Sequence, residues 1–393
     1  MNILVVSAVL PFPLYSGGQI RLYNLLRILS SEHTIHLVSY IRDESEKAYL
    51  SELSFCASVR TIKRGRAWQG SYVLKTCFSQ YPFLYETYTA REAYGQIQEV
   101  LNTNHIDLIH IEPSYVGLGI PKTTLPVIAV EHNIEHEIYM QFVHKVRFPW
   151  LRWLLKFDIK KMIHAEETTW KSVAGVVAVS EDNKSYIERK ALGTPVYLVR
   201  NGVDLQKFLY QDEKKKQVQP VFLYVGNFAW MENQDAVSYL VSKLWPHILA
   251  HYPGATLRIV GKSMSNALSQ KIKGTNVKIL SDVENIQEEL DTATIMLAPI
   301  RIGGGTKYKI LESMACGLPV VTTTLGSEGI HARHGVHLYC ADSLDETLFA
   351  IHALLGSTRV YNTIRKQARK LIESRYSWEM IAKDLDFAWK NTR

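Results

Sequence analysis

Residues suited to bind an anion gather in one short segment of the second half of the chain. Positions 303–312 read Gly-Gly-Gly-Thr-Lys-Tyr-Lys-Ile-Leu-Glu and follow an apolar run at 295–299. Consecutive glycines let backbone N–H groups approach a ligand closely, and an expected helix start near Thr306 adds unpaired donors. The residues expected to hold a phosphate or diphosphate are Gly303, Gly304, Gly305, Thr306, Lys307 and Lys309.

Glu312 adds a second kind of chemistry to this segment. It follows Lys309 by three residues, so both side chains share roughly one face of the expected helix. A carboxylate there can accept hydrogen bonds from vicinal hydroxyls, such as those of a ribose. The alternative is a strand–turn–helix unit whose glycines serve packing alone, with Glu312 solvated. The combination of glycines, two lysines and one carboxylate favours the binding interpretation.

A second glycine pair lies near the N-terminus. Gly17 and Gly18 follow the apolar run at 3–9 and precede an expected helix, which is another place where backbone can approach a ligand. Arg21 lies one turn into that helix and can reach an acceptor or a phosphate. The alternative is an ordinary helix start with a solvated Arg21.

His132 comes directly after an expected strand at 126–131, where the carboxyl end of a parallel strand places ligand-binding residues. An imidazole there can hydrogen-bond a ligand or assist acid–base chemistry. Glu131 and Asn133 flank it, and Glu131 and Glu135 either orient the imidazole or are solvated. The alternative is a histidine with a purely structural role.

The elements that must position these residues follow a repeated strand–helix pattern. Short apolar runs alternate with amphipathic stretches, which is typical of parallel sheets built from βαβ units. A charged stretch at 211–219 separates two such series. We therefore predict an α/β protein with two doubly wound domains, residues 1–204 and 220–375. A linker at 205–219 joins them, and a helix at 376–393 follows.

Eleven apolar runs are predicted to be strands. They lie at 3–9, 34–40, 107–111, 127–130, 175–179, 221–225, 256–260, 277–280, 295–299, 319–322 and 336–339. The clearest helices cover 20–29, 306–316 and 344–356, and one long helix is expected over much of 135–172. Ligands of such sheets bind at the carboxyl ends of the strands, so we expect the site in a cleft between the two domains.

Composition excludes several classes of protein. The 393 residues are 47% hydrophobic and 21% charged, which excludes disorder as the main state. No run approaches the ~18 apolar residues of a membrane span. The net charge of +7 is too diffuse to argue for nucleic acid as a partner. The four scattered cysteines indicate free thiols, and the N-terminus lacks the basic region of a signal peptide, so we expect a cytoplasmic protein.

Several of these segments together resemble one family, the GT-B-fold glycosyltransferases of family 4. The run Glu-Ser-Met-Ala-Cys-Gly-Leu-Pro-Val from Glu312 is similar to the end of the family's helix motif, which carries a Glu, seven residues and a second Glu. Asn-Gly-Val-Asp at 201–204 resembles the motif at its inter-domain connection. Gly17 and Gly18 match its glycine loop, and the segment around His132 resembles its His-Asn-x-Glu segment. The matches cover essentially the whole chain in the family's order.

The chain departs from the family pattern at three positions. Gly304 stands where the family's first Glu binds hydroxyls of the donor sugar, so sugar recognition must be arranged differently. After Gly226, Asn227 and Asn233 occupy the positions where many members carry an Arg and a Lys that clamp the diphosphate. Two lysines appear instead on the glycine-rich segment. We infer that the charge has moved and has not been lost, because a diphosphate leaving group needs cationic stabilisation.

The resemblance implies a retaining, metal-independent glycosyltransferase of the hexosyltransferase type. It implies no cofactor and a nucleotide-diphosphate sugar as donor, such as a UDP- or GDP-sugar. Residues 1–204 would bind the acceptor, 220–375 the donor, and the last helix would cross back to the first domain. The expected catalytic residues are His132, Lys307, Lys309 and Glu312. The expected donor contacts are Gly17, Gly18, Gly226, Asn227, Asn233, Gly303, Gly304, Gly305, Thr306, Lys307, Lys309 and Glu312. The expected acceptor contacts are Arg21, Glu131, His132 and Asn133.

The sequence does not identify the acceptor, and it allows two functions other than sugar transfer. A saccharide, a lipid-linked sugar or a small molecule could receive the sugar, in the synthesis of a cell-surface polysaccharide or a glycolipid. A nucleotide-sugar 2-epimerase of the same fold would need no acceptor. A nucleotide-sugar-binding protein without transfer activity is motivated by the missing first Glu. No Asp-x-Asp follows a predicted strand, and no HExxH or His/Cys cluster occurs, so we expect no metal.

One further segment bears on location. Residues 145–161 mix Lys and Arg with Trp, Leu and Phe, a composition that suits an anionic membrane surface at the inner face of the membrane. The alternative is an amphipathic helix packed on the first domain with its cations solvated.

Overall fold

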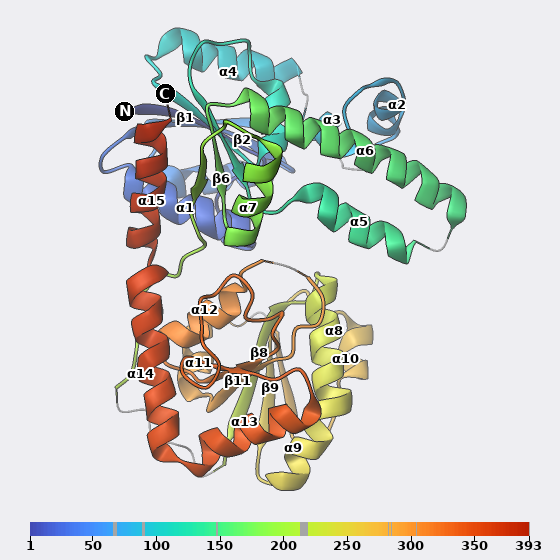
Figure 1. Cartoon of the computed structure of the whole chain (residues 1–393), viewed down its shortest axis with the longest axis vertical. Helices are drawn as coiled ribbons and strands as arrows, with labels where there is room; N and C mark the ends of the chain where they lie inside the picture. The colour runs from blue at the N-terminus through green and yellow to red at the C-terminus, as the bar shows by residue number, and fades with distance from the viewer. Residues whose placement is uncertain are drawn as a thin grey trace. The chain divides into compact units, whose positions relative to one another are not determined.

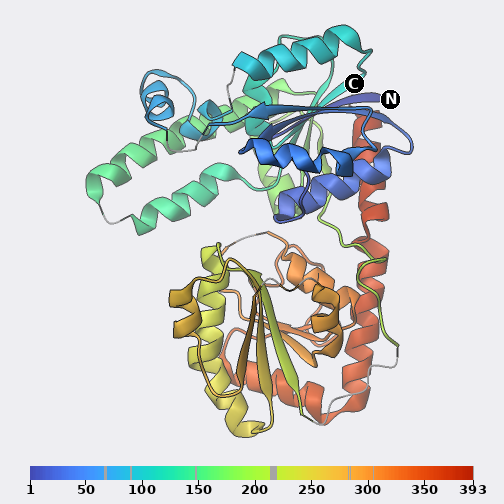
Figure 2. The same ribbon diagram turned by 180° about the vertical axis from the view of Figure 1, so that it is seen from behind.

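The computed structural model describes residues 1–65, 69–88, 91–146, 148–212, 219–281, 283, 285–303 and 305–392. The chain forms two compact units. The first comprises Met1–Arg200 together with Ile381–Arg393, and the second comprises Asn201–Met380. Each unit has its own parallel sheet covered by helices on both faces (Figures 1 and 2).

The first unit is built on a seven-stranded parallel sheet in the order β3-β2-β1-β4-β5-β6-β7. Its strands are β1 Asn2–Ser7, β2 Thr34–Ile41, β3 Ser58–Lys63, β4 Leu108–Glu112, β5 Val127–Glu131, β6 Gly175–Ala178 and β7 Val196–Leu198. Most residues of the central strands are fully buried, as expected for a sheet covered on both faces. The order reverses between β1 and β4, where Ser7 pairs with Glu112 at the carboxyl ends.

Helices of the first unit connect these strands. They are α1 Gly17–Leu29, η1 Glu44–Leu53, α2 Gly70–Phe78, α3 Phe83–Glu86, α4 Arg91–Thr103, η2 Ser114–Gly119, α5 Glu135–Lys145, α6 Pro149–Ser172 and α7 Glu181–Lys190. The long helix expected over much of 135–172 is α6, but it begins only at Pro149, and a separate helix, α5, ends at Lys145. A proline breaks the hydrogen bonding of a preceding turn but fits the first turn of a new helix.

The second unit is built on a six-stranded parallel sheet in the order β10-β9-β8-β11-β12-β13. Its strands are β8 Val221–Asn227, β9 Thr256–Lys262, β10 Val277–Ser281, β11 Ile295–Ala298, β12 Val320–Thr322 and β13 Tyr339–Cys340. Its helices are α8 Met231–Tyr239, η3 Leu240–Leu244, α9 Trp245–His251, α10 Asn266–Lys271, α11 Ile286–Thr292, α12 Tyr308–Ala315, α13 Leu344–Gly356 and α14 Thr358–Arg375. Here the order reverses between β8 and β11. The prediction of an α/β protein with two doubly wound sheets is confirmed.

The last helix, α15 Trp378–Asn391, begins in the second unit and continues into the first. Near its start, the Val203 amide donates to the Tyr376 carbonyl at 2.7 Å. A Cβ on Gly202 would lie 2.7 Å from Cε3 of Trp378, so only glycine fits against this indole. The Asn-Gly-Val-Asp segment therefore packs on the chain that leads into α15.

Candidate active site

Gly18 and His132 lie against each other at the carboxyl edge of the first sheet. Gly18 is the second residue of α1, whose N-cap Ser16 accepts a hydrogen bond from the Gln19 amide. His132 follows β5 directly. A Cβ on Gly18 would lie 3.1 Å from Cε1 and 3.4 Å from Nδ1 of His132, so the missing side chain leaves room for the imidazole. The structure thus brings the predicted glycine loop and the predicted histidine together.

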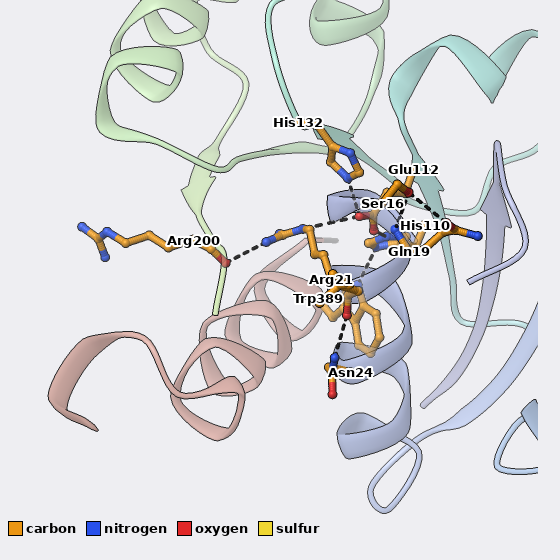
Figure 3. Close-up of polar contacts among 10 residues, drawn as sticks. Ser16, Gln19, Arg21, Asn24, His110, Glu112, His132, Arg200 and Trp389 are labelled. Atoms are coloured by element: carbon orange, nitrogen blue, oxygen red, sulfur yellow. Dashed lines mark hydrogen bonds and ion pairs between the residues drawn. The ribbon is translucent and has the colours of Figure 1, made fainter. Parts of the chain in front are cut away.

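A buried carboxylate holds His132 in place. Oε1 of Glu112, the last residue of β4, lies 2.6 Å from Nε2 of His132 and 3.4 Å from Nε of Arg21 (Figure 3). Its other oxygen lies 2.8 Å from Nε2 of His110. Burial alone would raise the pKa of Glu112, but the hydrogen bonds from both histidines and the charge of Arg21 hold that pKa far below its ordinary value. Glu112 is therefore an anion.

Two residues predicted to contact the acceptor are buried instead. Only 1% of Arg21 is exposed, and besides Glu112 it contacts the Arg200 carbonyl, to which it donates at 2.7 Å (Figure 3). The predicted acceptor contact of Arg21 is therefore corrected to an internal ion pair.

Glu131 is also fully buried, and it accepts a hydrogen bond of 2.6 Å from Nε1 of Trp170. Burial and the nearby charge of Glu166 raise the pKa of Glu131 well above its ordinary value, so it is a neutral acid inside the unit. The interpretation that Glu131 orients the imidazole is corrected, since Glu112 does so. Asn133 is half-buried beside His132.

In the second unit, Asn233 in the first turn of α8 links the end of β8 to helix α12. This side chain donates from Nδ2 to the Asn227 carbonyl at 2.8 Å and accepts at Oδ1 from the Tyr224 hydroxyl at 2.9 Å. Nζ of Lys309 also donates to Oδ1 of Asn233 and lies 3.2 Å from the Tyr224 hydroxyl. A Cβ on Gly226 would lie 2.9 Å from Cγ of Asn233, so this approach requires glycine.

Lys307 hydrogen-bonds the backbone of the two described glycines that precede it. Its Nζ donates to the carbonyls of Gly305 at 2.7 Å and Gly303 at 3.4 Å. Both glycines have positive φ, +92° for Gly303 and +72° for Gly305, a backbone conformation that other residues rarely adopt. Gly304 lies outside the described residues. Helix α12 begins at Tyr308, two residues later than predicted, and half-buried Thr306 precedes its cap.

Lys309 and Glu312 stand one turn apart on α12, and burial moves both toward neutrality. Burial lowers the pKa of Lys309 to about 7, against the opposing charges of Glu232 and Glu312. Burial also raises the pKa of Glu312 to about 7, partly offset by the charges of Lys207 and Lys309. Near pH 7, both groups are therefore about half-ionised and respond to the charge of a ligand.

Sequence reasoning missed His110, Glu112, Trp389 and Tyr224 as contributors to these sites. The predicted strand at 107–111 stopped one residue short, so Glu112 was left outside it. The signal was present, because His110 and Glu112 are two residues apart and therefore share one face of a strand that is otherwise apolar.

Within the described part of the chain, one trio of possible metal ligands lies together: Glu32, His33 and Asp386. None of these belongs to the sites above, and the expectation of a metal-free reaction stays a prediction. None of the helices among the described residues is both long and apolar enough to cross a bilayer.

Comparisons with known proteins identify the family. Residues 15–207 match Glycosyltransferase Family 4, and residues 219–357 match Glycosyl transferases group 1. The chain belongs to the family 4 glycosyltransferases. This glycosyltransferase is 25% identical over 377 residues to an "Uncharacterized 44.6 kDa protein in cps region" of Klebsiella pneumoniae, covering 91% of this chain and 92% of that one.

Solved structures show that this glycosyltransferase has the GT-B fold. It is similar to sucrose-phosphate synthase from Thermosynechococcus elongatus, with a TM-score of 0.74, 15% identity, and coverage of 99% of this chain and 98% of that one. It is also similar to HepE from Anabaena in complex with UDP and glucose, with a TM-score of 0.68, 15% identity and 99% coverage of both chains.

Proposed function

We propose that this glycosyltransferase moves a sugar from a nucleotide-diphosphate sugar to an acceptor, with retention of the anomeric configuration and without a metal ion. The contact between Lys309 and Asn233 carries the proposal. It places an ammonium group against Asn233, in the first turn of α8, a position where many family members supply a cation of their own. The UDP and glucose bound to HepE support a nucleotide sugar as the donor.

The residues of the second unit match the parts of a nucleoside diphosphate. In our proposal, Lys309, Lys307 and the amides of the glycine-rich loop stabilise the diphosphate as negative charge develops on it. Glu312, one turn further along α12, accepts hydrogen bonds from the ribose hydroxyls. Retention then needs no protein nucleophile, because the leaving diphosphate can take the acceptor's proton on the same face of the sugar.

We assign the transferred sugar to His132 of the first unit. The imidazole is 23% exposed at its side chain, whereas the carboxylate that holds it is 2% exposed, so His132 is the member of this pair that a ligand can touch. The acceptor is a saccharide, a lipid-linked sugar or a small molecule. The position of the Klebsiella relative in a cps region supports a role in making a cell-surface polysaccharide.

A donor panel tests the proposal. UDP- and GDP-sugars are incubated with and without lipid-linked or sugar acceptors, in the presence of EDTA, and nucleoside diphosphate release is measured. We expect release with at least one donor and an anomer of unchanged configuration by NMR. Lys309→Ala should lower kcat at least about 100-fold, since one group aimed at developing charge supplies a few kcal/mol. Lys366→Ala, an exposed lysine on α14, is the matched control.

Each other outcome has a distinct meaning. A donor converted to an epimer without an acceptor would identify an epimerase. Tight nucleotide-sugar binding without turnover would identify a binding protein. Wild-type rates in Lys309→Ala would refute the role of this lysine, and loss of activity in EDTA would refute metal independence.

We also propose that α6 contacts an anionic membrane. Trp150, Trp153, Leu154 and Phe157 follow the i, i+3, i+4, i+7 spacing of one helix face, and 48–69% of each residue is exposed. A row of exposed aromatic residues beside lysines suits the interface of an anionic bilayer. Lys156 and Lys160 are exposed on the same helix.

Not every charge of the 145–161 segment is available to lipid. Lys161 donates to the carbonyls of Thr76 and Ser79 at 2.6 and 2.7 Å, so it holds the end of α2. Asp158 accepts from the Phe83 amide at 2.9 Å. Arg147 lies outside the described residues.

Vesicle sedimentation tests this contact. Wild-type protein should bind vesicles that contain phosphatidylglycerol and not vesicles of phosphatidylcholine alone. Replacing Trp150 and Trp153 by Ser, and Lys156 and Lys160 by Gln, should abolish binding. Phe349→Ser, which changes an apolar residue on α13 that is 66% exposed, is the control. Equal binding by wild type and the variant with all four substitutions would refute the proposed membrane contact.

A further inference from the structure

A tryptophan of the C-terminal helix fixes the tautomer of His110. Nε1 of Trp389 donates a hydrogen bond of 3.0 Å to Nδ1 of His110 (Figure 3). An indole can only donate, so Nδ1 of His110 must be the acceptor and carries no proton. The ring proton of His110 is therefore on Nε2, which donates to Glu112 at 2.8 Å. All three side chains are almost completely buried, so water does not compete for these bonds.

Glu112 passes this constraint to His132. As an anion it only accepts hydrogen bonds, and with one oxygen occupied by His110 its other oxygen faces Nε2 of His132 at 2.6 Å. Nε2 of His132 must then carry the proton, which leaves Nδ1 bare in the neutral imidazole. Nδ1 lies on the ring edge that faces Gly18, and the described residues give it no hydrogen-bond partner.

We propose that the chain Trp389–His110–Glu112 sets the tautomer of His132, so that Nδ1 accepts a hydrogen bond from a hydroxyl of the substrate. Trp389, His110 and Glu112 are positioning residues in this proposal, and only His132 touches the ligand. The identity of the hydroxyl rests on the proposed function, whereas the tautomer of His132 does not.

The variant Glu112→Gln separates this proposal from a purely structural role. In the wild type, each histidine donates to one carboxylate oxygen of Glu112. An amide has one accepting oxygen and one donating NH₂ group, so it can accept from only one of the two histidines. His110 cannot change its tautomer while Trp389 occupies Nδ1, so the amide oxygen goes to His110 and the NH₂ group faces His132. The charge of Arg21, whose Nε lies 3.4 Å from this position, opposes the orientation, but Trp389 leaves His110 no other tautomer. His132 must then accept at Nε2 and move its proton to Nδ1.

Removing the tryptophan contact should reverse the effect. In Glu112→Gln combined with Trp389→Phe, Nδ1 of His110 can hold a proton and Nε2 can accept from the amide. The charge of Arg21 then draws the amide oxygen back to the His132 side, and Nδ1 of His132 becomes bare again. A second substitution that restores function is the opposite of what two independent structural losses would give.

Nitrogen NMR of the histidine rings tests the tautomer directly. The protein is labelled with ¹⁵N-histidine, and His132 is assigned among the 14 histidines by its loss in His132→Gln. At pH 8 we expect a bare Nδ1 in wild type and Trp389→Phe, a protonated Nδ1 in Glu112→Gln, and a bare Nδ1 again in the double variant. A protonated Nδ1 in wild type, or no change in Glu112→Gln, would overturn the proposal.

Turnover gives a second readout. Glu112→Gln should lower kcat at least about 100-fold, as expected when a histidine is held in the wrong tautomer, with little change in donor KM. The kcat of the double variant should be at least ten-fold higher than that of Glu112→Gln, and a double variant no faster than Glu112→Gln would contradict the proposal.

The NMR result stands even if wild type turns over no donor, so failure of the proposed function and failure of this inference are distinguishable. Thermal melts verify that each variant is folded. If Trp389→Phe does not fold, the spectrum of Glu112→Gln alone still shows whether the tautomer of His132 changes.

Discussion

Binding of a nucleotide sugar to the second unit should release protons at pH 6 and take them up at pH 8. Lys309 and Glu312 both have a pKa of about 7 in the free protein. A bound diphosphate favours the charged form of Lys309, so binding adds a proton wherever that lysine is neutral. Ribose hydroxyls that donate to Glu312 favour its ionised form, so binding removes a proton wherever that acid is neutral.

The size of the effect follows from the two pKa values. At pH 6, roughly nine-tenths of Lys309 is already charged and nine-tenths of Glu312 is protonated, so binding that fully ionises both groups releases about 0.8 protons net. At pH 8 the proportions reverse and binding takes up about 0.8 protons. The two contributions cancel near pH 7. The diphosphate of a nucleotide sugar is esterified at both ends, so the ligand adds no titration of its own in this range.

Calorimetric titration in two buffers with different ionisation enthalpies measures this exchange. Lys309→Met should show proton release only, and Glu312→Gln should show uptake only, which separates the two contributions. A proton exchange that keeps one sign from pH 6 to pH 8 in wild type would refute the assignment of these residues. So would a Lys309→Met variant that still takes up protons at pH 8.

Three further predictions concern the architecture of the two units. Gly18→Ala should lower kcat roughly ten-fold by displacing His132, without lowering the melting temperature, whereas Gly95→Ala on α4, where a Cβ meets nothing within 4 Å, should leave kcat unchanged. Glu112 should stabilise the fold above its unfolded pKa of about 4.3, so wild type should lose about 1.4 kcal/mol per pH unit below that value relative to Glu112→Gln, measured by thermal melts from pH 5 to pH 3. Gly317→Ala should cost about 1–3 kcal/mol in denaturant unfolding, because the φ of +67° at this helix end strains any side chain.

Most of the fold could be predicted because buried parallel strands appear in a sequence as continuous apolar runs. All eleven predicted strands overlap strands of the structure, although 336–339 overlaps β13 only at its last residue. The strand β3 was missed because its residues are mostly half-buried and mixed in polarity, and β7 was missed because it has only three residues. The break between α5 and α6 was missed because the aromatic and basic composition continues across Pro149.

The second-unit site was more accessible to sequence reasoning than the first. Its glycines, Lys307, Lys309 and Glu312 lie within ten residues, so local spacing alone brings them close. The residues that hold His132 are distant in sequence, since His110 and Trp389 are 279 positions apart. A single sequence carries no signal that pairs such positions, and the contacts arise only when β4 and α15 pack together.

The two sites use buried charge in opposite ways, and each suits its proposed ligand. Glu112 receives donors from several sides and stays ionised across the neutral range, so it can hold an imidazole in one orientation while uncharged hydroxyls come and go. Among the described residues, the side chains that hydrogen-bond Lys309 are the neutral Asn233 and Tyr224, and burial outweighs the charges of Glu232 and Glu312, so the charge of Lys309 depends on the ligand. A nucleoside diphosphate carries more negative charge than the sugar donor from which it comes, so it stabilises protonated Lys309 more strongly. Release of that product must then give up a proton, and product release should become easier as the pH rises above 7.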